Sequence, residues 1–321
     1  MASRRIALYF SWSRAKENRV PLGLLENRFP ALFEFRRAIW PHYEHASNPA
    51  QFQQDVSGFL DHVVLLDFQR FREVIKSITG SLPEVFQRED SEGQPSLLNP
   101  EMLKNLDTLI VVSLDHFSTG QTLQPEEEQA LKKFLERRDA TLVVCPHHDI
   151  GATEDQGERI VEHSHHGDVL VPSQQRLGGF ARSVLSALDL QIENQFGLSP
   201  ERSADGSPAP LKISRDEDEL RILEGVTTFN LHGHLPHLSI LDGSVGRVRV
   251  LAKQLINSGA STHPFVQAGN DSFNAFLWAS PEGARAGNVF VCDATLWSSA
   301  FGGSESPLKF WQNLAKLPLE S

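Results

Sequence analysis

The sequence is poor in cysteine, in long apolar runs and in positive charge, and each shortage excludes a class of protein. Two cysteines, Cys145 and Cys292, cannot build a disulfide framework, nor an all-thiolate zinc site by themselves. No segment approaches the about 18 uninterrupted apolar residues that indicate a membrane helix. The net charge of −11 argues against a general nucleic-acid binder, which needs a basic face.

The remaining composition is that of an ordinary folded protein. The 321 residues are 40% hydrophobic and 22% charged, enough for a real core in one large domain or two ordinary ones. The apolar run Ile6–Phe10 behind the two N-terminal arginines is too short for a signal peptide. We therefore expect a soluble, cytoplasmic protein that acts on a small-molecule substrate, without a nucleic-acid or membrane partner. A homo-oligomer is compatible with this composition.

The clearest local pattern lies in the middle of the chain, where two apolar runs flank a helical stretch. Asp107–Ser113 is a continuous apolar run of the kind found in buried parallel strands. Pro125 suits the first turn of a helix, because the acidic Glu126–Glu128 follow it and basic residues lie near the end. A second apolar run ends at Cys145. This order predicts a parallel sheet with a right-handed crossover.

Other elements follow from periodicity and turn residues. Further strands are predicted at Arg5–Ser11, Val226–Phe229, Leu238–Leu241, Val248–Leu251, Ala275–Trp278 and Asn288–Cys292. Helices are predicted at Pro30–Tyr43, Gln174–Leu190 and Pro307–Leu317, and another helix continues through Phe71, Val74 and Ile78. A loop is predicted at Gln87–Pro95.

The order of elements from Asp107 to Cys145 resembles the class I glutamine amidotransferase-like superfold. The stretch Gly287–Thr295, followed by a helix at Phe310–Leu314, is similar to the last strand and helix of uncharacterised branches of that superfamily. The resemblance implies an α/β fold of three layers (α/β/α, flavodoxin-like), with a mostly parallel sheet and a β-rich C-terminal extension. We predict a single domain over residues 1–321, in which 195–285 is a β-rich insertion or subdomain.

The chain departs from that superfamily at the position of its nucleophile. True amidotransferases carry a nucleophilic cysteine in a Gly-x-Cys-x-Gly elbow, whereas Cys145 is flanked by Val144 and Pro146. The elbow requires a positive φ, but a residue before proline is driven toward the extended region. The flanking residues therefore argue against a glutaminase, and Cys145 is kept as the candidate nucleophile of a different Cys/His hydrolase.

Eight of the thirteen histidines fall in three short clusters, which are the main functional clue. The clusters are Cys145-Pro-His-His-Asp149, Glu162-His-Ser-His-His-Gly-Asp168 and His232-Gly-His-Leu-Pro-His237. Imidazoles and carboxylates gathered at strand ends and in loops are typical of metal and acid–base sites. Whether the three clusters meet in space is not readable from the sequence.

The first two clusters supply the predicted metal site and catalytic base. The predicted ligands of a divalent metal (Zn, Fe or Mn) are His147, His148, Asp149, His165, His166 and Asp168. Glu162 is the candidate general base, with His163 as a second catalytic candidate. The alternative is a polar loop whose Asp149 caps a turn, followed by an exposed histidine-rich loop with incidental metal affinity.

The remaining candidates are assigned to substrate binding. Ser13 and Arg14 follow the first predicted strand, and ligands of open α/β sheets bind outside the carboxyl ends of strands. The other residues of this group are Arg176, His232 and His234. An ordinary loop and structural histidines are the alternatives. Asp293, directly after a late strand, is either an acid–base partner or a cap.

Three functional hypotheses follow. The first is a metal-dependent hydrolase of an amide, ester or related carbonyl bond, in which the metal lowers the pKa of bound water toward about 7. The second is a non-catalytic amidotransferase-like domain that binds a ligand or a protein. The third is a hydrolase that uses Cys145 with a nearby histidine.

Overall fold

The computed structural model describes residues 3–13, 68–89, 94–115, 119–147, 178–232, 235–257, 264–298 and 305–319. The strands are β1 (Ile6–Ser13), β2 (Glu84–Glu89), β3 (Thr108–Ser113), β4 (Thr141–Pro146), β5 (Ile192–Leu198), β6 (Lys212–Ile213), β7 (Leu235–Ile240), β8 (Val248–Leu255), β9 (Ser272–Ala279) and β10 (Asn288–Cys292). The α-helices are α6 (Gln69–Thr79), α7 (Pro100–Leu103), α8 (Pro125–Phe134), α10 (Gly179–Ala187), α11 (Pro264–Gln267) and α12 (Glu305–Ala315). Two 3₁₀ helices are η2 (Asp242–Ser244) and η3 (Ala294–Trp297).

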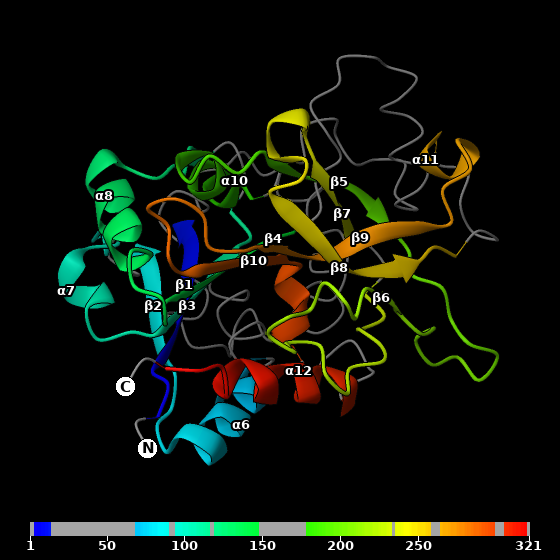
Figure 1. Ribbon diagram of the computed structural model, residues 1–321, viewed down its shortest axis with the longest axis horizontal. Coiled ribbons are helices and arrows are strands. Elements are labelled where there is room, and N and C mark those ends of the chain that lie inside the picture. The colour runs from blue at the N-terminus through cyan, green and yellow to red at the C-terminus, as the bar shows by residue number, and fades with distance from the viewer. Residues whose placement is uncertain are drawn as a thin grey trace, which may run out of the picture.

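Within these residues, one large sheet runs through the molecule in the order β2-β1-β3-β4-β10-β9-β8-β6 (Figure 1). The pairings from β2 to β10 are all parallel. Every residue of β3 and β4 is buried, which explains why both appear in the sequence as continuous apolar runs. The predicted strand–helix–strand unit is therefore confirmed, and the protein is an α/β protein with a mostly parallel sheet.

The second half of the sheet is antiparallel. β10 pairs with β9, β9 with β8 and β8 with β6, each in the antiparallel sense. The stretch 195–285, predicted to be rich in β-structure, thus extends the main sheet through β6, β8 and β9. Within the same stretch, β7 pairs with β5 in a separate two-stranded sheet.

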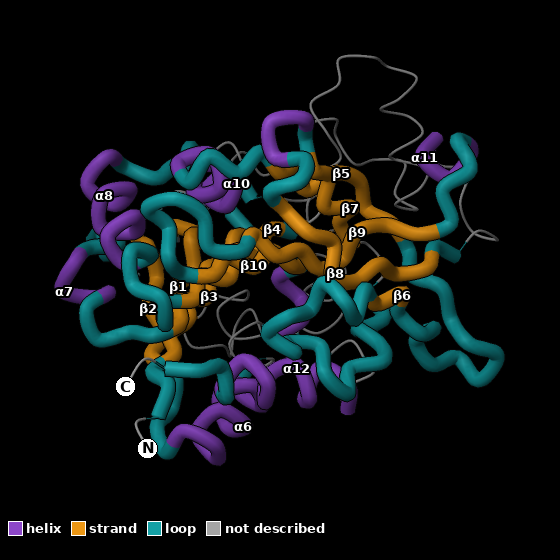
Figure 2. The backbone as a smooth tube through the Cα atoms, viewed as in Figure 1, coloured by secondary structure: helices purple, strands orange, loops and turns teal. Residues whose placement is uncertain are grey.

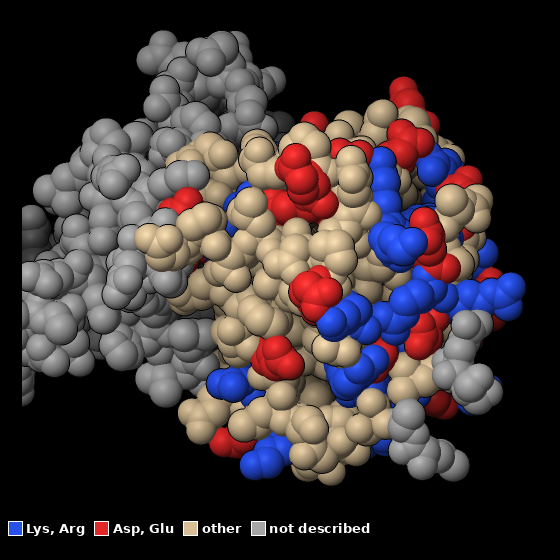
Figure 3. All heavy atoms as spheres, turned by 90° about the vertical axis from the view of Figure 1, so that its left-hand side faces the viewer, with Lys and Arg blue, Asp and Glu red and all other residues tan. Residues whose placement is uncertain are grey.

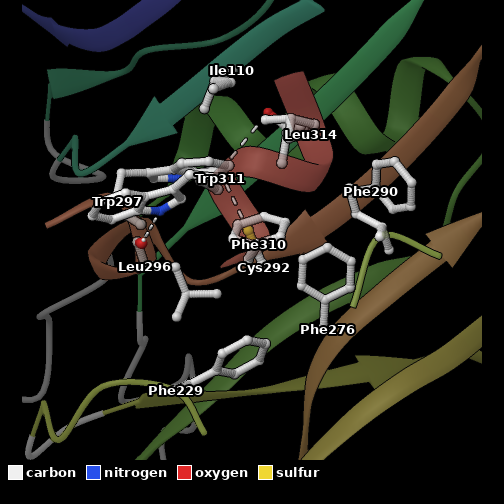
Figure 4. Close-up of a cluster of buried hydrophobic side chains, with 14 of the residues drawn as sticks. Ile110, Phe229, Phe276, Phe290, Cys292, Leu296, Trp297, Phe310, Trp311 and Leu314 are labelled. Atoms are coloured by element: carbon white, nitrogen blue, oxygen red, sulfur yellow. Dashed lines mark hydrogen bonds between the residues drawn. The ribbon is translucent and has the colours of Figure 1, made fainter. Parts of the chain in front are cut away.

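One face of the sheet is covered by α6 and α12 (Figures 1 and 2). Aromatic rings fill this interface: the Phe71 and Trp297 rings lie edge to face with centroids 5.0 Å apart, and Trp311 donates a hydrogen bond to the Leu296 carbonyl at 2.9 Å. Figure 4 shows Trp297 and Trp311 beside Phe310, with Cys292 of the sheet close by. Burial of these large apolar side chains is the main force that holds the two helices on the sheet.

The opposite face packs against α7, α8 and α10. Leu131 and Phe134 of α8 and Phe180 of α10 are buried against β3 and β4 residues such as Val111 and Val144. α8 begins at Pro125 as predicted, with glutamates in its first turn and lysines in its last, so its charge order matches the helix dipole.

Glu127 does more than complement that dipole, because it forms a buried ion pair with Arg88 of β2. The Arg88 guanidinium donates to both Glu127 carboxylate oxygens, at 2.5 and 2.7 Å, and a further bond reaches the Gln121 side chain at 2.8 Å. Arg88 is 3% exposed and Glu127 is fully buried. Leu98 donates its backbone N–H to the same carboxylate at 2.9 Å. The pair ties the edge strand β2 to α8.

Two element predictions are wrong. Val226–Phe229 is not a strand: Ser306 Oγ accepts the backbone N–H groups of Thr227 and Thr228 at 2.8 and 2.9 Å, so a side chain satisfies them instead of a neighbouring strand. The predicted loop Gln87–Pro95 begins inside β2, because parallel pairing with β1 extends the strand to Glu89. The predicted helix Pro30–Tyr43 lies outside the described residues.

Charges of both signs share the molecular face that carries α7 and α8 (Figure 3). Lys132 pairs with Glu128 at 2.5 Å, Arg137 with Asp107 at 3.0 Å, and Lys104 with a glutamate three residues before it. The exposed Lys132–Glu128 and Lys104–Glu101 pairs add little stability individually, whereas the Asp107 side chain is only 5% exposed. Among the helices of the described residues, none is long and apolar enough to cross a membrane.

Candidate functional site

The candidate site lies where β4 and β10 end. These two strands are parallel neighbours in register, with Val144 opposite Val291. The residues that follow these two strands therefore leave the sheet at the same edge. His147 directly follows β4 and Asp293 directly follows β10. The carboxyl edge of a parallel sheet is where α/β proteins bind their ligands.

A short hydrogen bond joins these two residues. His147 Nδ1 lies 2.8 Å from Asp293 Oδ2, and both side chains are almost fully buried, with 11% and 6% exposed. The second oxygen, Asp293 Oδ1, accepts the Thr295 backbone N–H at 2.8 Å and also the Thr295 hydroxyl. Asp293 thus caps η3, one of the two roles that the sequence left open, and it is also hydrogen-bonded to His147; its acid–base role stays a prediction.

The surroundings of Asp293 determine which atom of the His147–Asp293 pair carries the proton of their hydrogen bond. Burial alone would raise the pKa of Asp293, but nearby His147 and His232, with the hydrogen bonds from His147 and Thr295, hold the pKa below its usual range. An ionised carboxylate can only accept hydrogen bonds, so His147 carries its proton on Nδ1. When the imidazole is neutral, its other nitrogen, Nε2, is then the acceptor.

His232 of the third cluster lies beside His147. The two imidazole centroids are 5.0 Å apart, with the rings at 73°. The backbone N–H of His232 donates to Asn230 Oδ1 at 3.3 Å, and Asn230 Nδ2 donates to the Thr295 carbonyl and hydroxyl oxygens at 3.0 and 2.9 Å. The first and third histidine clusters therefore do meet, through these two residues.

Asn194 of β5 supports the backbone of the site. Its Nδ2 donates to the His147 carbonyl, and its Oδ1 accepts from Arg182 of α10 at 2.9 Å. Asn194 is 3% exposed. The turn that follows β4 is therefore held from the small β5–β7 sheet as well as from β10.

A neighbouring polar cluster caps α10. The carboxylate of Asp115, fully buried, accepts from Ser11 at 2.5 Å, from Ser113 at 2.6 Å and from the Phe180 backbone N–H at 3.1 Å. The protein's own carboxylate thus satisfies a backbone N–H at the amino end of α10. Gly178 precedes the helix with φ +77°, a left-handed conformation that favours glycine.

Cys145 lies inside the core. Its Sγ is 3.8 Å from Cys292 Sγ and accepts a hydrogen bond from Trp297 Nε1 at 3.1 Å. Both thiols are fully buried. Burial raises the pKa of Cys292 well above its usual value, with a further contribution from Cys145. A nucleophilic thiolate needs access to its substrate, and the buried Cys145 thiol lacks that access.

Most of the other candidates lie outside the described residues. These are Arg14, His148, Asp149, Glu162, His163, His165, His166, Asp168, Arg176 and His234. Ser13 ends β1 at the carboxyl edge of the sheet, which is as much as the structure describes of it. Among the described residues alone, no group of three or more His, Cys, Asp and Glu is arranged to hold a metal ion.

His237, the last histidine of the third cluster, has a structural place. Its Nδ1 accepts the Asn274 backbone N–H at 3.2 Å, and its ring packs on Phe265 with centroids 4.8 Å apart. Burial, with a smaller contribution from nearby Lys253, lowers the pKa of His237 to about 4. The imidazole is therefore neutral in the folded protein at physiological pH.

This lowered pKa predicts a loss of stability in mild acid. The unfolded chain takes up a proton at His237 below about pH 6.5, whereas the folded protein takes it up only near pH 4. Stability from this group is therefore complete above pH 6.5 and is lost as pH falls toward 4, by about 2 kcal/mol between pH 7 and pH 5. Urea unfolding of wild type and His237→Gln at both pH values tests this, since the glutamine variant should lose that much less. Parallel pH dependences would contradict it.

The comparisons with known proteins add little. No protein-family model matches this chain, and no curated protein does. Among solved structures, the mmIFT52 N-terminal domain is similar, with 11% identity, a TM-score of 0.45, and coverage of 79% of this chain and 92% of that one. A likeness this distant says nothing about activity. The fold and the site together define an α/β protein with a histidine–carboxylate pair at the carboxyl edge of its sheet.

Sequence reasoning missed most of the polar side chains around that pair. Asp293 was recognisable from its place after a strand, but Thr295, Asn230 and Asn194 were not. A faint signal existed for Thr295, because an aspartate two residues before a threonine is a common capping arrangement. Asn230 and Asn194 lie in unremarkable local sequence, and only their contacts reveal them.

Proposed function

We propose that this protein is a hydrolase of an amide, ester or related carbonyl bond, with His147 at the centre of its chemistry. The observation that supports this most directly is the 2.8 Å contact between His147 Nδ1 and Asp293 Oδ2. A buried carboxylate on Nδ1 orients an imidazole and makes its Nε2 a stronger base and a better ligand. Buried carboxylate–histidine pairs at the carboxyl edge of a sheet are typical of such sites.

In this proposal His147 Nε2 takes up the proton of the attacking water or binds the metal that activates it. Asp293 stabilises the positive charge that develops on the imidazole. His232, edge-on to His147, contacts the substrate, as its sequence cluster suggested. The orientation of His147 is thus prepared before substrate binds, which lowers the cost of reaching the transition state.

The metal-dependent form of the hydrolase needs ligands from the segment after His147. The candidates are His148, Asp149, His165, His166 and Asp168, with Glu162 and His163 as acid–base residues. A divalent Zn, Fe or Mn ion held there would lower the pKa of bound water. The donor set of imidazoles and carboxylates suits such ions, and the Asp293–His147 contact is the supporting bond that a metal-binding histidine ordinarily has.

We infer for the fold a three-layer, flavodoxin-like arrangement of the class I glutamine amidotransferase-like superfold. The strand order β2-β1-β3-β4-β10, with helices against both faces, supports this. A non-catalytic, ligand- or protein-binding member of that superfold is the alternative function. The buried place of Cys145 favours it over a Cys145-dependent hydrolase.

The test combines metal analysis with an activity screen on protein purified without a histidine tag. Wild type, His147→Gln and His166→Ala are compared for bound metal and for hydrolysis of a panel of aryl esters and amides. We expect near-stoichiometric metal and hydrolysis in wild type, both lost in the two variants. His237→Gln is the matched control, because it makes the same change at a histidine outside the site, and it should keep both.

The outcomes separate the forms of the proposal. Hydrolysis without metal, lost in His147→Gln alone, would assign His147 as a metal-free general base. Hydrolysis lost on alkylation of Cys145 but not on chelation would favour the cysteine enzyme. Wild-type protein that hydrolyses nothing in the panel, with or without added metal, would overturn the hydrolase and leave the binding domain.

A further inference from the structure

The place of His232 depends on an irregular segment that has no strand or helix to hold it. The chain from β6 to residue 232 consists of loops and turns (Figure 2). It is anchored near Thr227 by two hydrogen bonds to Ser306 and by burial of Phe229, whose ring packs on Phe276 with centroids 6.3 Å apart. Beyond Phe229, the next anchor is Asn230.

The Asn230 side chain forms hydrogen bonds through both its amide nitrogen and its amide oxygen. Its amide nitrogen donates to the Thr295 carbonyl at 3.0 Å and to the Thr295 hydroxyl at 2.9 Å, while its oxygen accepts the His232 backbone N–H at 3.3 Å. The same Thr295 donates to Asp293, which holds His147. Asn230 is 1% exposed, so these bonds are shielded from competing water.

We propose that Asn230 is the positioning residue of this site, and that it sets the place of His232 against the His147–Asp293 pair. The two histidines lie 85 positions apart in the sequence, and the Asn230 side chain links the residues that support them. It acts through Thr295 and the His232 backbone and does not touch substrate. The role within a reaction rests on the proposed hydrolase, whereas the placement of the two rings does not.

The test uses Asn230→Asp, which keeps the size of the side chain but replaces the donor by a carboxylate facing the Thr295 carbonyl. Asn230→Ala is the second variant, in case the new charge prevents folding. Asn313→Asp is the matched control, because Asn313 also donates its side-chain amide to two backbone carbonyls, those of Ile222 and Glu224, on another element. The control should leave the site unchanged.

The first readout is NMR of histidine-labelled protein, which needs no activity. In wild type and Asn313→Asp, we expect a cross-relaxation signal between the His147 and His232 ring protons, assigned by its loss in His147→Gln and His232→Gln. In Asn230→Asp or Asn230→Ala this signal should disappear, while the His147 Nδ1 proton resonance remains. A signal retained in both Asn230 variants would overturn the proposal.

The second readout is kinetic and follows once hydrolysis is measured. We expect kcat to fall about 10- to 100-fold in Asn230→Asp, the usual cost of losing a supporting partner, with a smaller change in KM. An unchanged kcat would overturn the role in the reaction. A wild type without hydrolysis would refute the proposed function, but the NMR result would still decide the positioning role.

Discussion

Asp293→Asn is expected to lower the rate of the proposed hydrolysis by about 10²- to 10⁴-fold without unfolding the protein. The asparagine can still accept the Thr295 backbone N–H through its oxygen. Its amide nitrogen would then face His147 Nδ1, which must become an acceptor and move its proton to Nε2. That tautomer can neither take a proton from water nor bind a metal through Nε2.

The control for this substitution is Asp205→Asn, which makes the same change on an exposed turn. It should leave hydrolysis within error of wild type. Nitrogen chemical shifts of His147 report the tautomer directly, and the protonated nitrogen should change from Nδ1 to Nε2 in Asp293→Asn alone. A variant that keeps the wild-type rate and tautomer would show that Asp293 serves only as the cap of η3.

Glu127→Gln is expected to lower the free energy of unfolding by about 3–5 kcal/mol. The substitution leaves the Arg88 guanidinium buried without its charge partner, against the ring of Phe180 at 4.4 Å. Tyr9, which accepts from Arg88 at 3.1 Å, stays as a neutral partner because burial raises the pKa of its hydroxyl above its usual range. Urea unfolding measures the loss as a lower midpoint at an unchanged slope.

Glu128→Gln is the matched control on the same helix. Glu128 pairs with Lys132 at 2.5 Å, but the two side chains are 39% and 53% exposed, so the loss should stay within about 0.5 kcal/mol. A double variant, Arg88→Met with Glu127→Gln, removes both charges while the glutamine oxygen can still accept the Leu98 N–H, and it should recover part of the stability lost in Glu127→Gln. Equal effects of the two single glutamine variants would contradict the buried ion pair.

The elements that the sequence predicted well are those with the strongest local pattern. The apolar runs of β3, β4 and β10 and the proline-led start of α8 are properties of a few neighbouring residues. Such patterns persist in the fold because burial on both faces requires an uninterrupted apolar strand. Val226–Phe229 is apolar enough to resemble a strand, but the N–H groups of Thr227 and Thr228 donate to Ser306, 79 and 78 positions away.

Only part of the candidate site could be predicted from local sequence patterns. His147 and His232 were singled out because histidines cluster around them, and the structure brings these two together. Cys145 was singled out because it ends a strand, and it proved to be a core residue beside Cys292. Position along a strand indicates which edge a residue is near, but not whether its side chain faces the solvent or the helices that pack on the sheet.

The sequence by itself determined the α/β character of this protein, the strands and helix from Asp107 to Cys145 and the histidine clusters, because these depend on short-range periodicity and composition. Only the tertiary structure decided that Asp293 meets His147 across 146 positions, and that Arg88 meets Glu127 across 39. Both contacts depend on which elements become neighbours, β4 with β10 and β2 with α8. That choice comes from the summed packing of the whole core, and no local pattern carries it.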